Sequence, residues 1–353
     1  MIIERIKNKQ FVLIAEIGVN YYDIASKLNI SNLDAAKLMM REAKDAGIHA
    51  VKFQSYKAES LAVKNSPAYW DTTEEPTKSQ YELFKKFDSF GEEEYRALKA
   101  YADDIGITFL STAFDNQAAD YLNDMMDIFK ISSSDLNNIP FIAYQAKKKK
   151  PIILSVGAAN LDEIQEAVAT IRRYNDLPLV LMHCVLEYPT PYRDANLNKI
   201  VSLGKEFPDV YIGYSDHTKP DASLDVIKTA YNLGAAVIEK HFTLDKSLVG
   251  NDHYHAMDKE DARKIVEGIQ FIDEIRGSYM IESLPAEQAA RENARRSLVS
   301  RVTIEKGQQI TEGMLTYKRP GKGIPPNQIN QLLGKKINQS IAADTVLTWD
   351  MFN

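Results

Sequence analysis

Three things are scarce in this sequence: cysteine, long hydrophobic runs and an excess of one charge. Cys184 is the only cysteine in 353 residues, which excludes disulfide bonds within the chain and is typical of a reducing compartment. No apolar stretch approaches the roughly 20 residues of a membrane-spanning helix, and the opening MIIERIKNKQ is charged where a secretion signal needs an apolar core. The net charge is −6 and no basic arm is present, which argues against a nucleic-acid partner. We therefore expect a cytoplasmic protein without membrane or nucleic-acid partners.

Short apolar segments rich in β-branched and aromatic residues alternate with longer segments of helical period. They cover residues 11–18, 50–56, 108–114, 128–134, 151–157, 179–185, 210–217 and 236–244. Each is too short for a typical helix and has the composition of a buried parallel strand. Gly47, Gly106 and Gly234 stand just before three of them, where a helix end favours a residue that tolerates positive φ. Eight strands alternating with helices predict a (β/α)8 (TIM) barrel over residues 1–277. A doubly wound open sheet is the alternative, but no glycine-rich dinucleotide motif follows the first segment.

The composition changes after the predicted barrel. We expect a linker at 278–296 and a small, mostly β domain at 297–353, a size at the lower end of independent stability. Within the barrel, the connection at 57–91 is long and contains the aromatic cluster Pro67-Ala68-Tyr69-Trp70-Asp71. This connection follows a strand, so it either covers an active site or packs as a surface loop.

Polar residues gather toward the C-terminal halves of the predicted strands, where barrel enzymes build their sites. The set is Glu16, Lys52, Gln54, Thr112, Lys130, Ser133, Asp135, Ser155, His183, Tyr188, Ser215, His217, Glu239 and His241. Its lysines and hydroxyl groups suit a ligand with phosphate and carboxylate groups, because charge-assisted hydrogen bonds are the strong ones. We infer that the barrel is an enzyme rather than an inert scaffold.

Histidines provide candidate metal ligands. His217 and His241 end successive predicted strands, so their imidazoles can converge on one divalent ion, with Glu16 completing the metal sphere or acting as a base. Two histidines with oxygen ligands suit Mn²⁺ acting as a Lewis acid, with Mg²⁺ or Co²⁺ as alternatives. We expect His49 to be a hydrogen-bonded core residue. His253 and His255, in the segment GNDHYHAMD, either touch substrate or are solvated.

Eight motifs in chain order resemble those of the sialic acid synthase family, which includes the N-acetylneuraminate, legionaminate and pseudaminate synthases. They are AEIGVN, VKFQSY, FLSTAFD, KISSSDLNN, ILSVGAAN, HCVLEYPTPY, GYSDHT and IEKHFTLD. The C-terminal stretch containing YKRPGKGI resembles the small antifreeze-like (SAF) domain of that family. The resemblance covers nearly the whole chain.

This resemblance implies a role for each matching residue. The phosphoenolpyruvate site matches Lys52, Thr112, Lys130, Ser133, Ser155 and Ser215. The metal ligands match His217 and His241, the active-site glutamate matches Glu16, and positions facing the sugar match Gln54, Asp135 and Tyr188. Arg319 matches an arginine that reaches into the partner subunit's barrel, which implies a domain-swapped homodimer.

The implied reaction condenses phosphoenolpyruvate with an N-acylated hexosamine aldehyde and releases phosphate by C–O cleavage. N-acetylmannosamine, a 2,4-diacetamido-trideoxyhexose or a less common relative would all fit as the sugar. Three alternatives stay open: a related synthase for a phosphorylated sugar, a metal-dependent barrel hydrolase, and a sugar- or ice-binding protein. No second basic cluster is evident for a sugar phosphate, and the first strand ends in Glu16-Ile-Gly rather than the His-x-His of many such hydrolases.

The chain departs from the family pattern at three places. Asn20 is followed by Tyr21-Tyr22-Asp23 rather than His-Asn-Gly, Leu186 replaces Asn or Ser, and Ser132-Ser133-Ser134 lacks the usual glycines. Leu186 and the two tyrosines predict a more apolar pocket wall, which favours a deoxy sugar.

Overall fold

The computed structural model describes residues 2–70, 72, 73, 75–250 and 252–352. The chain divides into two compact units, one ending at Arg276 and the other beginning at Gly277. We describe each unit by itself. Among the described residues, no helix combines the length and the hydropathy that crossing a membrane requires.

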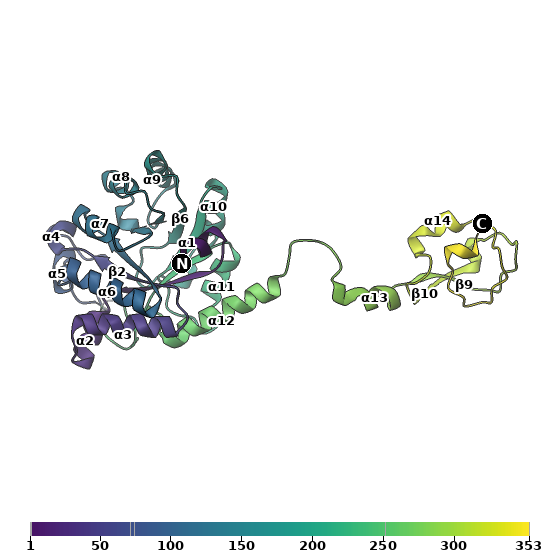
Figure 1. Cartoon of the computed structure of the whole chain (residues 1–353), viewed down its shortest axis with the longest axis horizontal. Helices are drawn as coiled ribbons and strands as arrows, with labels where there is room; N and C mark the ends of the chain where they lie inside the picture. Colours follow the sequence, from purple (N-terminus) through teal and green to yellow (C-terminus); the bar gives the residue numbers. More distant parts are fainter. Residues whose placement is uncertain (1, 71, 74, 251, 353) are drawn as a thin grey trace. The chain divides into compact units, whose positions relative to one another are not determined.

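The first unit is a closed barrel of eight parallel strands in sequence order, as predicted (Figure 1). The strands are β1 (Val12–Gly18), β2 (Ala50–Ser55), β3 (Thr108–Ala113), β4 (Phe129–Ile131), β5 (Ile152–Ser155), β6 (Leu179–Cys184), β7 (Tyr211–Asp216) and β8 (Val237–His241). The barrel closes where β1 pairs with β8, placing Glu16 opposite His241, while on its other side Glu16 faces Lys52. Pairing of β7 with β8 sets Ser215 opposite Glu239. The register thus brings polar residues from distant sequence positions to one end of the barrel.

Helices surround the strands in Figure 1. They are α1 (Ile2–Lys7), α2 (Tyr21–Leu28), α3 (Asn32–Asp45), α4 (Ala58–Leu61), α5 (Gln80–Lys86), α6 (Glu92–Ile105), α7 (Asn116–Asn123), α8 (Ile139–Ala146), α9 (Leu161–Tyr174), α10 (Asn198–Glu206), α11 (Asp225–Asn232) and α12 (Lys259–Arg276). Gly47, Gly106 and Gly234 have φ values of 85°, 71° and 114°, which confirms their predicted role at helix ends. The Asn160 backbone N–H donates to the Glu163 carboxylate at 2.8 Å, closing the first turn of α9.

The second unit has its own small core, in which Leu298, Ile304, Leu315 and Leu347 are buried. Strand β9 (Ser297–Ser300) pairs antiparallel with β10 (Leu315–Lys318), and isolated bridges tie further segments together. The helices are α13 (Gln288–Asn293) and α14 (Ile329–Leu332). Residues 278–296 are mainly exposed, with one short 3₁₀ turn before α13.

Candidate active site

Eleven of the thirteen predicted site residues line a single cavity at the C-terminal ends of the strands. They are Glu16, Lys52, Gln54, Thr112, Lys130, Ser133, Ser155, Tyr188, Ser215, His217 and His241. Glu239, Cys184 and Leu186 complete its wall together with Phe114 and Ser132. We call this cavity the lysine chamber. Alternation along each strand produces it, because every second side chain points into the barrel.

Two lysines and two glutamates form the charged floor of the lysine chamber. The Lys52 Nζ lies 2.5 Å from Glu16 Oε2 and 3.6 Å from Glu239 Oε1, and the Lys130 Nζ lies 3.7 Å from the same Glu239 oxygen. Burial disfavours the Lys52 ammonium, but the two carboxylates outweigh it and raise the Lys52 pKa. Burial lowers the pKa of Lys130 and raises that of Glu16. The floor therefore places two lysine ammonium groups, each within 3.7 Å of a glutamate carboxylate, where an anionic ligand can bind.

Hydroxyl groups surround these lysines. Thr112 Oγ1 accepts a hydrogen bond from Lys52 Nζ at 3.2 Å, and Ser215 Oγ donates to Glu239 Oε1 at 3.3 Å. Ser133 Oγ accepts from the Gly157 N–H at 3.1 Å. Ser155 Oγ is buried and has no hydrogen-bond partner among the described residues. A buried hydroxyl without a partner is expensive, so Ser155 is positioned for a ligand oxygen.

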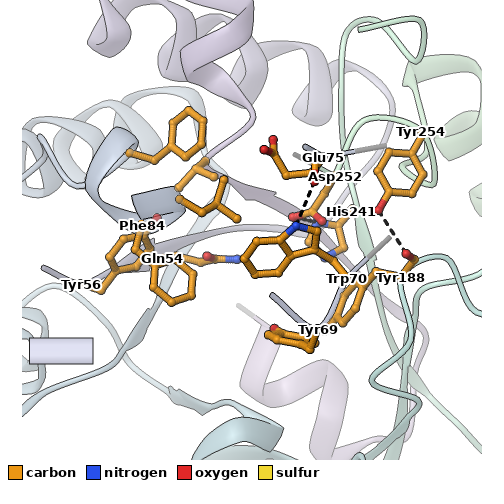
Figure 2. A pocket seen from close by; sticks show the side chains of 13 residues that line it. Gln54, Tyr56, Tyr69, Trp70, Glu75, Phe84, Tyr188, His241, Asp252 and Tyr254 are labelled. Atoms are coloured by element: carbon orange, nitrogen blue, oxygen red, sulfur yellow. Dashed lines mark hydrogen bonds and ion pairs between the residues drawn. The ribbon is translucent and has the colours of Figure 1, made fainter. Parts of the chain in front are cut away.

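A second cavity adjoins the first and shares Gln54, Tyr188 and His241 with it. Its remaining wall is mainly aromatic and aliphatic, with Glu75 and Asp252 as its carboxylates: Val19, Tyr56, Tyr69, Trp70, Glu75, Leu83, Phe84, Phe87, Asp252 and Tyr254. We call it the aromatic chamber; Figure 2 shows most of these side chains converging on it. Trp70 Nε1 donates to the Glu75 carbonyl at 3.1 Å, and Tyr254 OH donates to the Tyr188 carbonyl at 3.2 Å. The long connection thus contributes to the site through Tyr69 and Trp70, whereas Asp71 lies outside the described residues.

Three histidines meet where the two chambers join. The ring centroids of His241 and His255 are 4.9 Å apart, and that of His217 lies 5.6 Å from His241 and 6.2 Å from His255. The Asp252 carboxylate comes within 3.3 Å of His241 Nδ1 and 3.7 Å of His255 Nε2. Ligand atoms of His241, Asp252 and His255 all lie within 4.8 Å of one another. His217 is outside that group, and its Nδ1 lies 2.7 Å from the Val185 carbonyl, which leaves Nε2 as the ring nitrogen with a lone pair.

These histidines fit a divalent metal. Burial lowers the pKa of His217 to about 4 and the pKa of His241 well below its usual value, so both imidazoles are neutral near neutral pH. His241 Nδ1 has no hydrogen-bond partner among the residues that the structure describes. Neutral imidazoles beside a carboxylate are the donors that Mn²⁺ and its neighbours accept.

The two remaining predicted site residues are Asp135 and Arg319. Asp135 sits in the 3₁₀ turn Ser133–Asp135 after β4, outside the lining of both chambers, and burial raises its pKa to about 6. Arg319 is exposed in the second unit, directly after β10. The undecided His183 is buried outside the chambers, with Nε2 2.8 Å from the Ala195 carbonyl and its ring stacked on Tyr214.

The sequence predictions for the other histidines and for the tyrosine pair are partly corrected. His49 Nδ1 accepts from the Leu13 N–H at 3.1 Å, as expected, but His49 is half-buried rather than part of the core. His253 and His255 are not solvated, since both are fully buried. Tyr21 and Tyr22 are not among the residues that line the two chambers; Tyr21 stacks on Phe90 instead. The expectation that this pair forms a pocket wall was wrong, because α2 turns it toward a neighbouring aromatic cluster.

Sequence reasoning did not select Asp252, His255, Glu75, Tyr69 or Trp70 as individual site residues. All of them lie on connections, where no periodic pattern reveals which side chains point inward. The polar segment after β8 and the aromatic cluster after β2 were the available signals. Glu239 was visible in the strand pattern, two residues before His241.

Both parts of the chain match known protein families. Residues 39–280 match the NeuB family model and residues 295–353 match the SAF domain model. The chain is 37% identical to the N,N'-diacetyllegionaminic acid synthase of Legionella pneumophila, over 96% of this chain and 93% of that protein. It is 32% identical to the human N-acetylneuraminate-9-phosphate synthase, over 95% of this chain and 90% of that protein. The crystal structure of the N-acetylneuraminic acid synthetase from Leptospira borgpetersenii, in complex with citrate, matches with a TM-score of 0.67 at 32% identity, covering 79% of this chain and 90% of that one. This chain therefore belongs to the NeuB family and ends in a SAF domain.

Proposed function

We propose that this chain is a nonulosonic (sialic-type) acid synthase, which condenses phosphoenolpyruvate with the open-chain aldehyde of an N-acylated hexosamine. One observation carries the proposal: a chamber suited to an anion adjoins a chamber suited to a sugar, and both share Gln54, Tyr188 and His241. Two substrates bound side by side react through the atoms that meet at this shared wall. The relatives named as legionaminic acid and N-acetylneuraminate-9-phosphate synthases support the same chemistry.

The lysine chamber would hold phosphoenolpyruvate. Lys52 and Lys130 provide the charge for its phosphate and carboxylate, and the hydroxyls of Thr112, Ser155 and Ser215 fix its orientation. The methylene carbon C3 then attacks the aldehyde carbon of the sugar. Water adds at C2, and phosphate leaves by cleavage of the C–O bond.

Glu16 is the group that we assign to the water. Its carboxylate is buried, accepts a hydrogen bond from Gln54 Nε2 at 2.7 Å and faces Lys52, so it is fixed beside the anion site. Positioned proton transfer typically contributes about 10²–10⁴-fold to a rate. A divalent ion at His217 and His241, which we propose is Mn²⁺, would polarise the aldehyde oxygen.

The aromatic chamber favours an unphosphorylated sugar with few hydroxyl groups. Among its described lining residues there is no lysine or arginine, whereas a sugar phosphate would need one. Rings of Tyr69, Trp70 and Phe84 instead suit the methyl groups of N-acyl substituents and of a deoxy carbon. We therefore favour a 2,4-diacetamido-trideoxyhexose over N-acetylmannosamine, and either over a phosphorylated sugar.

The second unit fits a role across a dimer. Residues 277–353 contain ten Lys+Arg and seven Asp+Glu, whereas the whole chain has a net charge of −6. The small unit is therefore basic and the barrel acidic, which favours docking of Arg319 at a barrel mouth of a second subunit. We propose a domain-swapped homodimer in the cytoplasm, with residues 278–296 as the linker between a barrel at 1–277 and a small domain at 297–353.

The test is release of inorganic phosphate. The purified protein would be incubated with phosphoenolpyruvate, Mn²⁺ and a panel of diacetamido-hexose, mannosamine and phosphorylated sugars. Phosphate that appears only with an unphosphorylated amino sugar supports the proposal. Preference for a phosphorylated sugar, sugar-independent hydrolysis or no turnover with the entire panel would contradict it.

Glu16→Gln tests the assigned base. We expect kcat to fall about 10²–10⁴-fold while phosphoenolpyruvate binding persists, because removing this negative charge leaves both lysines in place. The exposed Glu4→Gln, which makes the same chemical change far from the chambers, serves as the control. Full kcat in Glu16→Gln would refute the role.

A further inference from the structure

We infer that His255 is a third imidazole ligand of the metal centre and that, with Asp252, it makes the site selective for nitrogen-preferring transition metals over Mg²⁺. The inference rests on the proposed function only in placing the metal beside the aldehyde. His255 lies on the connection between β8 and α12. A bridge between Phe242 and Met257 folds this connection back onto the barrel end, and His255 is fully buried within it.

The two histidines of this connection contrast sharply in their hydrogen bonding. His253 has a partner for each ring nitrogen: Thr243 Oγ1 lies 2.7 Å from Nδ1, and Asp23 Oδ2 lies 3.0 Å from Nε2. His255 has no hydrogen-bond partner for either nitrogen among the described residues. A fully buried polar ring without partners is costly, so an unpartnered imidazole indicates a group that awaits a ligand. His253 anchors the loop, and His255 is available to bind.

The neighbours of His255 have the spacing of ligands around one ion. Asp252 reaches both His241 Nδ1, at 3.3 Å, and His255 Nε2, at 3.7 Å. Metal–ligand bonds near 2.1 Å place neighbouring ligand atoms about 3 to 4 Å apart. The rings of Tyr188 and Tyr254 contact His255 at centroid distances of 5.8 and 4.9 Å and shield this side of the centre from water.

Asn20, which follows β1, also holds the connection between β8 and α12 in position. Asn20 Nδ2 donates to the Phe242 carbonyl at 3.1 Å, and Asn20 Oδ1 accepts from the Asp252 N–H at 3.3 Å. Asp23, one of the three residues after Asn20 that depart from the family pattern, contacts His253 of the same segment, so Asn20 and Asp23 both hold the segment that carries the two proposed ligands. A fixed, nitrogen-rich donor set favours Co²⁺ or Mn²⁺ over Mg²⁺, which prefers oxygen ligands and keeps its waters.

Metal binding without substrates tests this inference. Metal-free protein would be titrated with Co²⁺, Mn²⁺ and Mg²⁺ by calorimetry, with the visible absorption of bound Co²⁺ as a second readout. We expect His255→Leu to raise the Kd for Co²⁺ at least about tenfold and to change the absorption spectrum of bound Co²⁺. The ratio of the Mg²⁺ Kd to the Co²⁺ Kd should become smaller. His255→Gln, which keeps a neutral polar side chain, should weaken Co²⁺ binding similarly.

Stability separates a ligand from a structural histidine. His255→Leu should leave the melting temperature of the metal-free protein unchanged or higher, since it removes an unpartnered polar ring, whereas His253→Leu should lower it. His49→Asn, remote from both chambers, is the control for unchanged metal affinity. Wild-type Co²⁺ affinity and spectrum in His255→Leu, or no Co²⁺ binding by the wild type, would overturn the inference. Because the titrations contain neither phosphoenolpyruvate nor sugar, failure of the proposed reaction would leave their result intact.

Discussion

A buried ion pair between the residues that precede His217 and His241 in the chain gives the sharpest stability prediction. Lys240 and Asp216 face each other across β7 and β8, with 2.6 Å between Nζ and Oδ2, and are 2% and 1% exposed. Lys240 Nζ also donates to the Thr218 carbonyl at 2.6 Å. Asp216 Oδ1 accepts from Tyr214 OH at 3.0 Å and from the Thr218 N–H at 2.9 Å.

Removing one partner leaves an uncompensated charge in the interior. Truncating one member of a buried pair typically costs about 3–5 kcal/mol. Lys240→Met should fall near the lower value, about 3 kcal/mol, because Asp216 keeps two hydrogen-bond donors. Asp216→Asn should cost nearer the upper value, about 5 kcal/mol, since Lys240 then keeps only the Thr218 carbonyl as a hydrogen-bond acceptor. The double variant should cost less than the sum of the two, with a coupling of about 1–3 kcal/mol.

Urea unfolding measures this cycle. Trp70 is the only tryptophan of the barrel and Trp349 the only one of the second unit, so Trp70 fluorescence in a Trp349→Phe background follows the barrel alone. Lys7→Met, which breaks the exposed pair with Glu4, is the control and should change nothing measurable. A cost below about 1 kcal/mol for Lys240→Met, or simple additivity in the double variant, would refute the reasoning.

Two further predictions concern the lysine chamber and pH. Gly157→Ala should weaken phosphoenolpyruvate binding about tenfold, because its Cβ would lie 2.6 Å from Cys184 Sγ and 3.1 Å from Ser133 Oγ. Calorimetric titration with phosphoenolpyruvate compares this variant with Gly204→Ala in α10, where the added Cβ makes only an ordinary contact. Equal affinities of the two variants for phosphoenolpyruvate would contradict the prediction. Burial lowers the pKa of His49 to about 4, so the unfolded chain takes up this proton near pH 6.5 and the folded chain only near pH 4. As the pH falls between those two values, the unfolding free energy of the wild type should therefore decrease by about 2 kcal/mol more than that of His49→Asn. This variant keeps a hydrogen-bond acceptor for the Leu13 N–H. Equal decreases in the two proteins, measured by urea unfolding at each pH, would contradict the prediction.

The barrel could be predicted from the sequence because its physical cause is local. Strands buried on both faces need short apolar runs, and helix ends need residues such as Gly106 that adopt positive φ. The polar positions could be predicted as well. Once strand ends are known, period-two alternation decides that Lys52, Lys130 and Glu239 point into one chamber. Eight of the eleven predicted residues in this cavity lie on strands, and Ser133, Tyr188 and His217 follow the ends of β4, β6 and β7.

Only the tertiary structure decided what the connections contribute. His253 and His255 are two residues apart in one polar segment, yet Thr243 and Asp23 contact both ring nitrogens of His253, while His255 lies beside His241 and Asp252 without a hydrogen-bond partner among the described residues. Tyr21 and Tyr22 looked suited to a pocket wall but pack elsewhere, whereas Tyr69 and Trp70 supply that wall. Loops lack a repeating period, so the direction of each side chain depends on partners hundreds of residues away, such as Asn20 for Asp252. The sequence by itself determined the barrel and its inward-facing strand residues, and the folded connections decided how the histidine cluster and the aromatic chamber are completed.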